Sequence, residues 1–383
     1  MKILAIICEF NPFHNGHKYL LETARNISGA DFILCIMSGN FTQRGEMCIL
    51  DKYTRAKHAI LGGADCVIQL PTSFAVAPAE IFAMGAVKIL SSIPEVTTLA
   101  FGCEDGDKKS FIDAAQLLTT ETDKFKSKLK EMLDNGESYI KSYATSFEVC
   151  GGDRQLVANP NNILGLEYTK AITRANANIE ILPIKRIGAG YNDSELKENY
   201  SSASAIRQNL NNSDIKNNLP EFVYDDLKYI NYCNEFDSML RHSLFKSTPD
   251  SLKHVYGCAE GLENKLKSLE NLQIGEIIEK ATSKRYSSSR IRRILCANAL
   301  ELYQDDCEKF LSTDLYIKPL AVKKQSADDI LSSLSKSKYP VITGIDTAKL
   351  NRTAQECFEK DKKEFSQYNF LTHSDKKDYM IIV

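Results

Sequence analysis

Along the first hundred residues, short apolar runs alternate with segments that have the apolar spacing of amphipathic helices. The apolar runs contain no alternating polar residues, so strands built from them would be buried on both faces. Such strands with helices between them form a parallel sheet that helices cover on both sides, with right-handed crossovers. We therefore predict an α/β fold with a Rossmann-like, doubly wound parallel sheet. The predicted strands are Lys2–Cys8, Phe32–Met37, Cys66–Leu70, Thr97–Phe101 and Ile179–Lys185, and the first helices are His14–Asn26, Lys52–Leu61 and Pro78–Leu90.

The pattern changes twice along the rest of the chain. Residues 107–150 are polar and helical, and amphipathic helices are predicted at Asn161–Arg174 and Ser204–Leu210. The polar segment 211–214 is typical of a linker, and the chain beyond it is mostly helical. We therefore expect a Rossmann-like domain at residues 1–210 and a mainly helical C-terminal domain at residues 211–383. Three apolar stretches of the tail could be strands or buried helix ends: Leu315–Val322, Tyr339–Ile342 and Tyr379–Val383.

Composition excludes several classes of protein. The net charge of −2 gives no overall field toward nucleic acid or an anionic membrane, so any RNA contact needs a local basic patch. The N-terminal apolar run is too short for a signal sequence or a membrane span, and we expect a cytoplasmic protein with no membrane partner. The 11 cysteines lack CxxC spacing and do not cluster with the 6 histidines. Reduced thiols are therefore expected, and no metal site is predicted.

The turn after the first predicted strand carries the strongest candidate for a functional site. His14 and His17 are three residues apart at the start of a helix, so both imidazoles lie on one face of its first turn. A helix N-terminus at the carboxyl end of a parallel strand offers free N–H groups and a positive dipole end, which suit phosphate. Gly16 would let a nucleotide approach the backbone closely. This arrangement predicts a site for nucleotide phosphates.

A second candidate segment, residues 201–207, begins the last predicted helix of the N-terminal domain. Ser201 or Ser202 is expected to cap this helix, and hydroxyl and N–H groups there could hold phosphates. Ser204 and Arg207 follow on the first two turns. A serine-rich helix cap followed by a surface arginine would have the same sequence. Residues 201–207 are therefore a stronger candidate for a phosphate site when they are considered together with the two histidines than when they are considered alone.

Both segments resemble motifs of one known superfamily. The string His14-Asn15-Gly16-His17 resembles the HxGH signature of the nucleotidyltransferase superfamily, in which two histidines bind ATP phosphates as pyrophosphate leaves. Residues 201–207 resemble its second motif, Ser-Ser/Thr-x-x-Ile-Arg, without the lysines of the aminoacyl-tRNA synthetase version. A true synthetase is therefore disfavoured. Longer strings, including residues 9–17, 38–46, 63–71 and 159–168, resemble the bacterial tRNA(Met) cytidine acetate ligase family, and the resemblance covers essentially the whole chain.

The resemblance implies an ATP-dependent ligase that activates acetate to acetyl-adenylate. The acetyl group would then pass to N4 of the wobble cytidine of elongator tRNA(Met), which forms N4-acetylcytidine. His14, His17 and Arg207 would be the catalytic residues. The implied ATP site comprises Ile7, Cys8, Glu9, Phe10, Asn11, Pro12, Phe13, His14, Asn15, Gly16, His17, Lys18, Tyr19, Leu20, Gly102, Asn162, Arg186, Ile187, Ser202 and Ser204. ATP is expected as its Mg²⁺ complex on general grounds, whereas no carboxylate cluster predicts a dedicated metal site in the protein.

The residue types suit these roles. Gly102 follows a strand where a side chain would block adenine or ribose, Asn162 can hydrogen-bond to ribose or base, and Arg186 can meet a phosphate with two N–H groups. Arg44 and Lys52 follow the second strand, and either could hold the acetate carboxylate or be an exposed, solvated cation. The residue before Lys52, Asp51, is expected to cap the helix that follows it.

The segment from residue 284 to residue 293 is the best basic candidate for RNA binding. It combines five cations with Tyr286 and three serines, which could supply phosphate contacts and base stacking. A solvated helix start with serine caps would have a similar composition. The candidate tRNA-binding residues are Lys284, Arg285, Arg290, Arg292 and Arg293.

Two other functions fit the motifs. A nucleotidyltransferase that adenylylates a phosphate-bearing cofactor precursor would use the same histidines, but it would not need residues 211–383. A tRNA-binding protein that keeps ATP as a structural ligand would not need His14, His17 and Arg207 to be intact. The sequence leaves open the oligomeric state and the choice between acetate and its close analogues, since one methylene changes binding by only about 1–3 kcal/mol.

Overall fold

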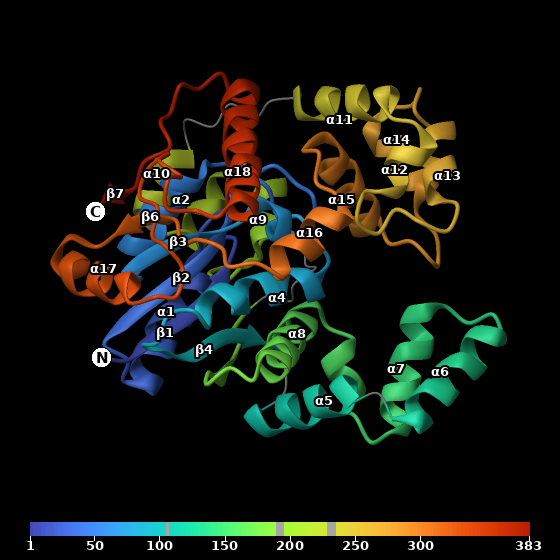
Figure 1. Ribbon diagram of the computed structural model, residues 1–383, viewed down its shortest axis with the longest axis horizontal. Helices are drawn as coiled ribbons and strands as arrows, with labels where there is room; N and C mark the ends of the chain where they lie inside the picture. The colour runs from blue at the N-terminus through green and yellow to red at the C-terminus, as the bar shows by residue number, and fades with distance from the viewer. Residues whose placement is uncertain (105–106, 121, 189–194, 228–234) are drawn as a thin grey trace.

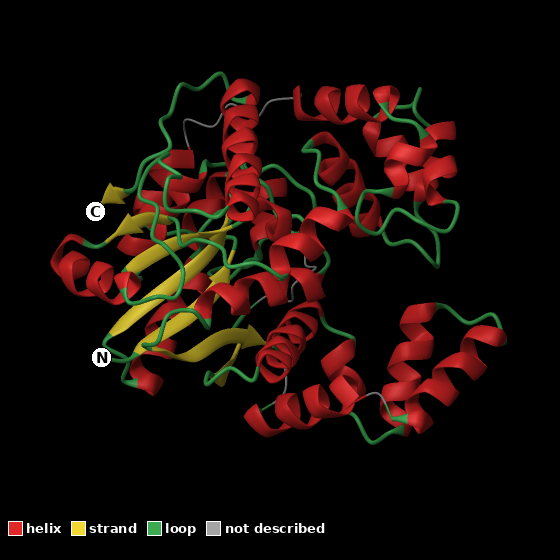
Figure 2. Cartoon of the chain, in the orientation of Figure 1, coloured by secondary structure: helices red, strands yellow, loops and turns green. Residues whose placement is uncertain are grey.

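The computed structural model describes residues 1–104, 107–120, 122–188, 195–227 and 235–383. Within these residues, seven strands form a central sheet, and helices cover both of its faces (Figures 1 and 2). The strand order is β5-β4-β1-β2-β3-β6-β7. The predicted α/β fold is confirmed. The strands are β1 (Ile3–Cys8), β2 (Phe32–Ser38), β3 (Cys66–Leu70), β4 (Val96–Cys103), β5 (Glu180–Lys185), β6 (Pro319–Val322) and β7 (Ile381–Ile382).

The sheet is parallel through its first five strands, as the apolar runs predicted, whereas β6 pairs antiparallel with β3. Successive residues of β1 enter two different cores. Ile3 and Ile7 pack with residues of α4 and α8, whereas Leu4 and Ile6 pack with residues of α1 and α2 on the other face. Because both faces are buried, every position of β1 is apolar.

Helices α1 (Asn15–Ser28) and α2 (Lys52–Leu61) contribute to one core, and α4 (Ala79–Leu90) and α8 (Pro160–Ala175) contribute to the other. Helix α5 packs against α8, and helices α6 and α7 extend beyond it, away from the sheet (Figure 1). The remaining helices up to residue 218 are α3 (Thr72–Ala75), α5 (Lys108–Thr120), α6 (Asp123–Asp134), α7 (Tyr139–Val149), α9 (Ala203–Gln208) and two 3-10 turns, η1 (Arg154–Val157) and η2 (Ser213–Asn218).

Beyond residue 218 the chain is mostly helical, as predicted, and residues from α11 (Glu235–Lys246) to α15 (Ser288–Ala299) form a third core. Phe41, from the loop after β2, is buried in this core together with residues of α11 and α15. The helices are α10 (Glu221–Leu227), α11 (Glu235–Lys246), α12 (Pro249–Lys253), α13 (Leu262–Ser268), α14 (Ile274–Ala281), α15 (Ser288–Ala299) and α16 (Gln304–Leu311).

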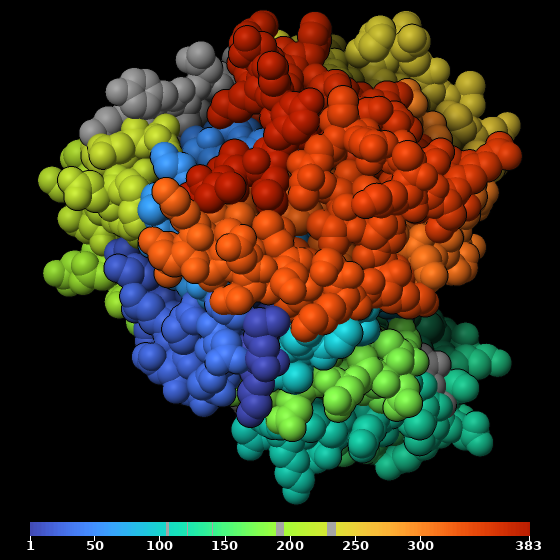
Figure 3. Space-filling view, turned by 60° about the vertical axis from the view of Figure 1, so that its left-hand side comes forward, coloured from blue at the N-terminus to red at the C-terminus, as the bar shows by residue number. Residues whose placement is uncertain are grey.

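The tail of the chain returns to the sheet. It contains β6, η3 (Lys324–Ser326), α17 (Ala327–Ser335), the long helix α18 (Arg352–Leu371) and β7. In the space-filling view, these orange to red residues cover a broad band of the surface beside the blue N-terminal residues (Figure 3). Two of the three ambiguous tail stretches therefore contain strands, and Val341 of the third forms a bridge with Ile317. The division at residue 210 stays a prediction, although two strands from beyond it extend the sheet.

The cysteines within the described residues are free, and apart from partly buried Cys150 they are buried. Cys233 lies outside the described residues. Among the residues that the structure describes, no helix is both long enough and apolar enough to cross a membrane.

Candidate active site

A cavity opens where β1, β4 and β5 end and where α1 and α9 begin. Residues 42–44 and 46, from the loop after β2, form another of its walls. The fold therefore brings together the two motif segments, which are far apart in the sequence. The predicted residues that line the cavity are Ile7, Cys8, Glu9, Phe10, Asn11, His14, Gly16, His17, Tyr19, Leu20, Gly102, Arg186, Ile187, Ser202, Ser204 and Arg207.

The two histidines form a capping box at the start of α1. His14 is the N-cap, and its Nδ1 accepts a hydrogen bond from Gly16 N at 3.1 Å. The Nδ1 atom of His17 accepts one from His14 N at 3.3 Å, and the rings stack with their centroids 3.7 Å apart. A Cβ atom on Gly16 would lie 2.9 Å from Cε1 of His14. Glycine at this position therefore makes room for the His14 imidazole.

Both imidazoles are neutral near pH 7. Burial, together with Arg186 and Arg207, lowers the pKa of His14 from 6.5 to about 3. Burial, His14 and Arg186 lower the pKa of His17 as well. A backbone N–H can only donate, so Nδ1 of each ring accepts and the proton of each neutral ring is on Nε2. The two Nε2–H groups are the ring donors that remain for phosphate oxygens.

Lowering the pH from 7 to 5 is expected to destabilise the protein through these histidines. His14 stays neutral in the folded state down to about pH 3, whereas in the unfolded chain it takes up a proton near pH 6.5. The contribution of neutral His14 to the free energy of unfolding is therefore complete above pH 6.5 and falls by about 1.4 kcal/mol for each pH unit below that. Urea unfolding at both pH values, for the wild type and for His14→Asn, which keeps an N-cap, measures the difference. Equal pH dependence in the two proteins would contradict the neutral imidazole.

Arg207 approaches the histidines from α9. Its Nη1 donates to Asn11 O at 2.8 Å, and its Nη2 lies 2.7 Å from Oε2 of Glu46. The cap of α9 is Ser202, whose hydroxyl accepts a hydrogen bond from Ala205 N at 3.0 Å. The structure thus selects Ser202 from the two predicted caps and orients α9 so that its arginine faces the cavity.

Arg186 follows β5 and lies against Gly102 of β4. A Cβ atom on Gly102 would be 3.3 Å from Cγ of Arg186, so glycine leaves room for the arginine side chain. Arg186 and Arg207 line the same cavity as His14, and both contribute to lowering the pKa of its imidazole. Two arginines and two N–H donors in one partly buried cavity suit a polyphosphate.

Five predicted ATP-site residues lie outside the cavity lining: Pro12, Phe13, Asn15, Lys18 and Asn162. Phe13 is fully buried against Gly62, where a Cβ atom would lie 2.3 Å from its ring. The Nδ2 atom of Asn15 donates to Asn217 O at 2.9 Å. Asn162 is fully buried, and its Oδ1 accepts a hydrogen bond from Glu104 N at 3.0 Å. These contacts fix the walls of the site.

The cavity also contains residues that sequence reasoning missed. Gln43 N donates to Oε1 of Glu9 at 2.6 Å, and burial raises the pKa of Glu9. Residues 38–46 form one of the strings that carry the family resemblance, but a loop has no periodicity that would predict which of its side chains face a cavity. The missed lining residues include Thr42, Gln43, Glu46, Asn161 and the apolar Phe82, Phe101, Leu164 and Tyr168.

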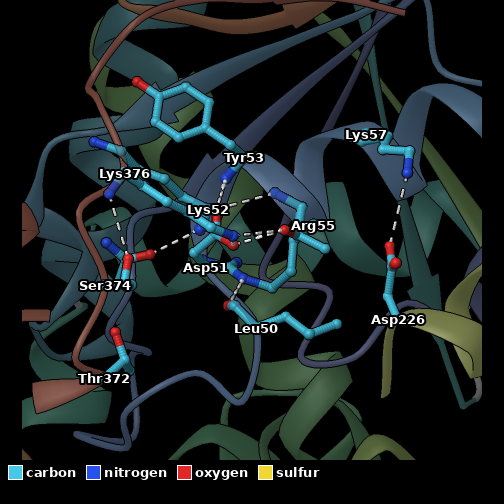
Figure 4. Close-up of polar contacts among 12 residues, drawn as sticks. Leu50, Asp51, Lys52, Tyr53, Arg55, Lys57, Asp226, Thr372, Ser374 and Lys376 are labelled. Atoms are coloured by element: carbon cyan, nitrogen blue, oxygen red, sulfur yellow. Dashed lines mark hydrogen bonds and ion pairs between the residues drawn. The ribbon is translucent and has the colours of Figure 1, made fainter. Parts of the chain in front are cut away.

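Of the two cations considered for acetate, Arg44 lines the cavity and Lys52 does not. The Lys52 ammonium is fully buried, 2.7 Å from Oδ1 of Asp378 and 2.9 Å from Oε1 of Gln69. The predicted cap of α2 is confirmed, because Oδ1 of Asp51 accepts a hydrogen bond from Tyr53 N at 2.9 Å. Figure 4 shows Asp51, Lys52 and Tyr53 at the start of α2.

The predicted tRNA-binding residues lie at and just before the start of α15, and several have partners within the protein. Arg285 lies 2.8 Å from Glu260, and Arg290 donates to Gly257 O and lies over the ring of Tyr286. Arg292 lies 3.1 Å from Oε1 of Glu46, and Nη1 of Arg293 donates to Gln43 O at 3.2 Å. Lys284 is exposed. Two of the five cations therefore contact the loop that lines the cavity.

The residues that the structure describes form no clear protein site for a metal ion. Within the described ranges, no group of three or more His, Cys, Asp or Glu side chains could hold a metal ion. The carboxylates that line the cavity are Glu9 and Glu46, and both are engaged with protein donors. These donors do not fit a dedicated Mg²⁺ site.

A histidine pair at the start of the first helix, at the carboxyl edge of the parallel strands, is the arrangement expected of a nucleotidyl transferase. The family model described as HIGH Nucleotidyl Transferase matches residues 1–380. The tRNA(Met) cytidine acetate ligase of Acetivibrio thermocellus is 37% identical over 89% of this chain and 88% of its own length. That of Clostridium perfringens is 34% identical over 100% of this chain and 98% of its own length. The chain belongs to the tRNA(Met) cytidine acetate ligase family within the HIGH nucleotidyl transferases.

Two solved structures agree with this assignment. The crystal structure of apo Thermotoga maritima TmcAL, form I, has a TM-score of 0.91 and 28% identity, and the match covers 100% of both chains. The structure of Thermotoga maritima TmcAL bound with alpha-thio ATP has a TM-score of 0.90 and 27% identity, again over 100% of both chains.

Proposed function

We propose that this protein uses ATP to activate acetate and then acetylates N4 of the wobble cytidine of elongator tRNA(Met), forming N4-acetylcytidine. The cavity with its two histidines and two arginines is the observation that carries the proposal. Relatives named tRNA(Met) cytidine acetate ligase that match along nearly the whole chain support the choice of substrates. The nucleotide is ATP, as the neighbour bound with alpha-thio ATP supports.

In the first step, an acetate oxygen attacks the α-phosphorus of ATP. The bond from that phosphorus to the oxygen that bridges it to the β-phosphate breaks, and pyrophosphate leaves. Negative charge grows on the leaving oxygens, so the protein's task is to hold donors there in advance. The Nε2–H groups of His14 and His17 and the guanidinium groups of Arg186 and Arg207 supply such donors. Neutral imidazoles can do this without any proton transfer.

In the second step, N4 of the cytidine attacks the carbonyl carbon of acetyl-adenylate. The carbon–oxygen bond to AMP breaks, AMP leaves, and the proton that N4 loses passes to the released AMP or to water. Water in the site would hydrolyse the adenylate, so a cavity with apolar walls such as Phe82, Phe101 and Tyr168 favours transfer over hydrolysis. Arg44 lines the same cavity and is the proposed contact for the acetate carboxylate.

Mg²⁺ is proposed to arrive as part of the ATP complex, where it neutralises phosphate charge. The cavity residues would then hold the phosphates rather than the metal. The helical region is proposed to bind the tRNA through the basic segment that begins at Lys284, in which Lys284, Arg285 and Arg292 are exposed.

One alternative is a nucleotidyltransferase that adenylylates a phosphate-bearing cofactor precursor. It would use the same histidines and arginines. It leaves unexplained why α15 contacts the loop that lines the cavity, since such an enzyme would not need residues beyond 211. The relatives named tRNA(Met) cytidine acetate ligase match the helical region as well as the cavity, which favours the tRNA ligase.

Acetate-dependent exchange of labelled pyrophosphate into ATP tests the proposal. We expect exchange with acetate in the absence of tRNA, and transfer of labelled acetate to tRNA(Met) when it is added. A tRNA whose anticodon has no cytidine at the wobble position is the control. Absence of exchange with any small carboxylate would refute the ligase and leave the cofactor adenylyltransferase as the better function.

A further inference from the structure

The loop of residues 41–47 joins the cavity to the helical region. Phe41 and Met47 form an antiparallel bridge across it. Thr42 N donates to Glu46 O at 2.9 Å, and Glu46 N donates to Oγ1 of Thr42 at 3.2 Å. Thr42 and Glu46 line the cavity, whereas Phe41 is buried in the core of the helical region. The loop is therefore a closed, hydrogen-bonded turn with one side in each part of the protein.

Helix α15 packs directly on this turn. Gly45 has a φ of 74°, and a Cβ atom there would lie 2.6 Å from backbone atoms of Arg292 and Arg293. The two backbones are thus in contact. Arg293 also donates to Gln43 O at 3.2 Å, and Gln43 N donates to the carboxylate of Glu9 at 2.6 Å. Because this packing leaves no space for a larger residue at position 45, the turn is held where α15 places it.

Glu46 connects two arginines from different parts of the chain. Its Oε2 lies 2.7 Å from Nη2 of Arg207, and its Oε1 lies 3.1 Å from Nη1 of Arg292. The side chains of Arg207 and Glu46 are 19% and 25% exposed, so water shields their ion pair only in part. Arg207 faces the cavity, whereas Arg292 does not line it. One carboxylate therefore ties the phosphate-facing arginine to the helical region.

We propose that Arg292 and Glu46 are positioning residues for adenylate formation, with Arg292 fixing Glu46 and Glu46 fixing Arg207 where it meets the ATP phosphates. This inference rests on the proposed function, and it gives Arg292 a role before any tRNA arrives. A guanidinium that is already in place stabilises the leaving pyrophosphate without reorganisation. The contact with Asn11 O fixes the other nitrogen of Arg207, so Glu46 completes its orientation.

Arg292→Gln and Glu46→Gln test the proposal in acetate-dependent pyrophosphate exchange without tRNA. Each substitution is expected to lower kcat/KM for ATP about tenfold and to leave KM for acetate unchanged. Because Arg292 acts on Arg207 only through Glu46, the double variant should be no slower than Glu46→Gln alone. Arg292→Lys keeps a charge and should recover part of the rate. The matched control is Arg352→Gln, which removes an exposed arginine of α18 that pairs with Glu356.

Wild-type exchange by Arg292→Gln, with loss of acetyl transfer to tRNA alone, would assign Arg292 to RNA binding and overturn the proposal. Additive losses in the double variant would overturn it as well. A wild-type protein that shows no carboxylate-dependent exchange would instead refute the proposed function. In that case calorimetric ATP binding still tests the positioning role, because Arg292→Gln should weaken the binding of ATP about tenfold and the control should not.

Discussion

Replacing His17 with alanine is expected to lower the rate of acetate-dependent pyrophosphate exchange by about 100- to 1,000-fold, with the fold intact. The reason is the loss of a preorganised N–H donor at the leaving phosphates, and removal of one such donor in other enzymes costs about this much. His17 lies on the first turn of α1 and stacks on His14. His14→Asn should have an effect of similar size, because asparagine keeps the helix cap but places no donor where Nε2 was.

The exchange assay should be accompanied by circular dichroism and thermal unfolding, so that loss of rate and loss of fold are separated. His242→Ala is a suitable control, because this histidine lies on α11 and is exposed. If folded His17→Ala kept its exchange rate within tenfold of the wild type, the histidine pair would not be the phosphate site. The cavity would then need another set of donors.

Replacing Asp378 with asparagine is expected to destabilise the protein by about 3–5 kcal/mol, the usual cost of leaving buried charges without their partner. Asp378 lies between two buried ammonium groups, 2.7 Å from Lys52 and 2.6 Å from Lys318. It also accepts a hydrogen bond from the Tyr53 hydroxyl at 2.6 Å. Burial by itself would raise the pKa of Asp378, but the two lysines lower it to about 2. The contribution of ionised Asp378 to the free energy of unfolding is therefore present above about pH 4 and is lost as the pH falls toward 2.

Urea unfolding at pH 7 measures this effect. Glu359→Gln is the control, since the exposed pair of Glu359 with Lys362 should contribute less than about 1 kcal/mol. Adding Lys318→Met to Asp378→Asn should recover part of the stability, because it removes one of the unpaired charges. A cost below about 1 kcal/mol for Asp378→Asn would show that the buried lysines do not depend on it.

The stability of this cluster also concerns the active site. Asp378 comes from the tail, whereas Lys52 begins α2, directly after the loop that lines the cavity. The tail also supplies Lys376, which pairs with the α2 cap Asp51 (Figure 4). Arg55 of α2 donates to Leu50 O at 2.9 Å and to Glu9 O at 2.6 Å. The C-terminal residues thus help to hold the segment between β2 and α2 on which the cavity depends.

The strands and helices that have a clear hydrophobic pattern within their own residues could be predicted from the sequence. Strands β1 to β5 and helices α1, α2, α4 and α8 were found to within a few residues, because each has a continuous apolar run or a clear helical period. Strands β6 and β7 could not be assigned, since they have four and two residues and form only because β3 offers an open edge. A strand of that length is too short to show a recognisable hydrophobic period in the sequence.

The sequence by itself determined the strand–helix turn with His14, Gly16 and His17, because a helix start, its cap and its spacing are properties of neighbouring residues. Only the tertiary structure decided which side chains face the cavity. Lys52 follows a cap and would be solvated in an isolated helix, but it is buried because the tail brings Asp378 to it. Arg292 belongs to a basic segment, but it contacts Glu46 because α15 packs on the loop after β2. Whether a charged side chain is buried, and which residue it pairs with, depends on segments that are distant in the sequence. No local sequence pattern can therefore predict it.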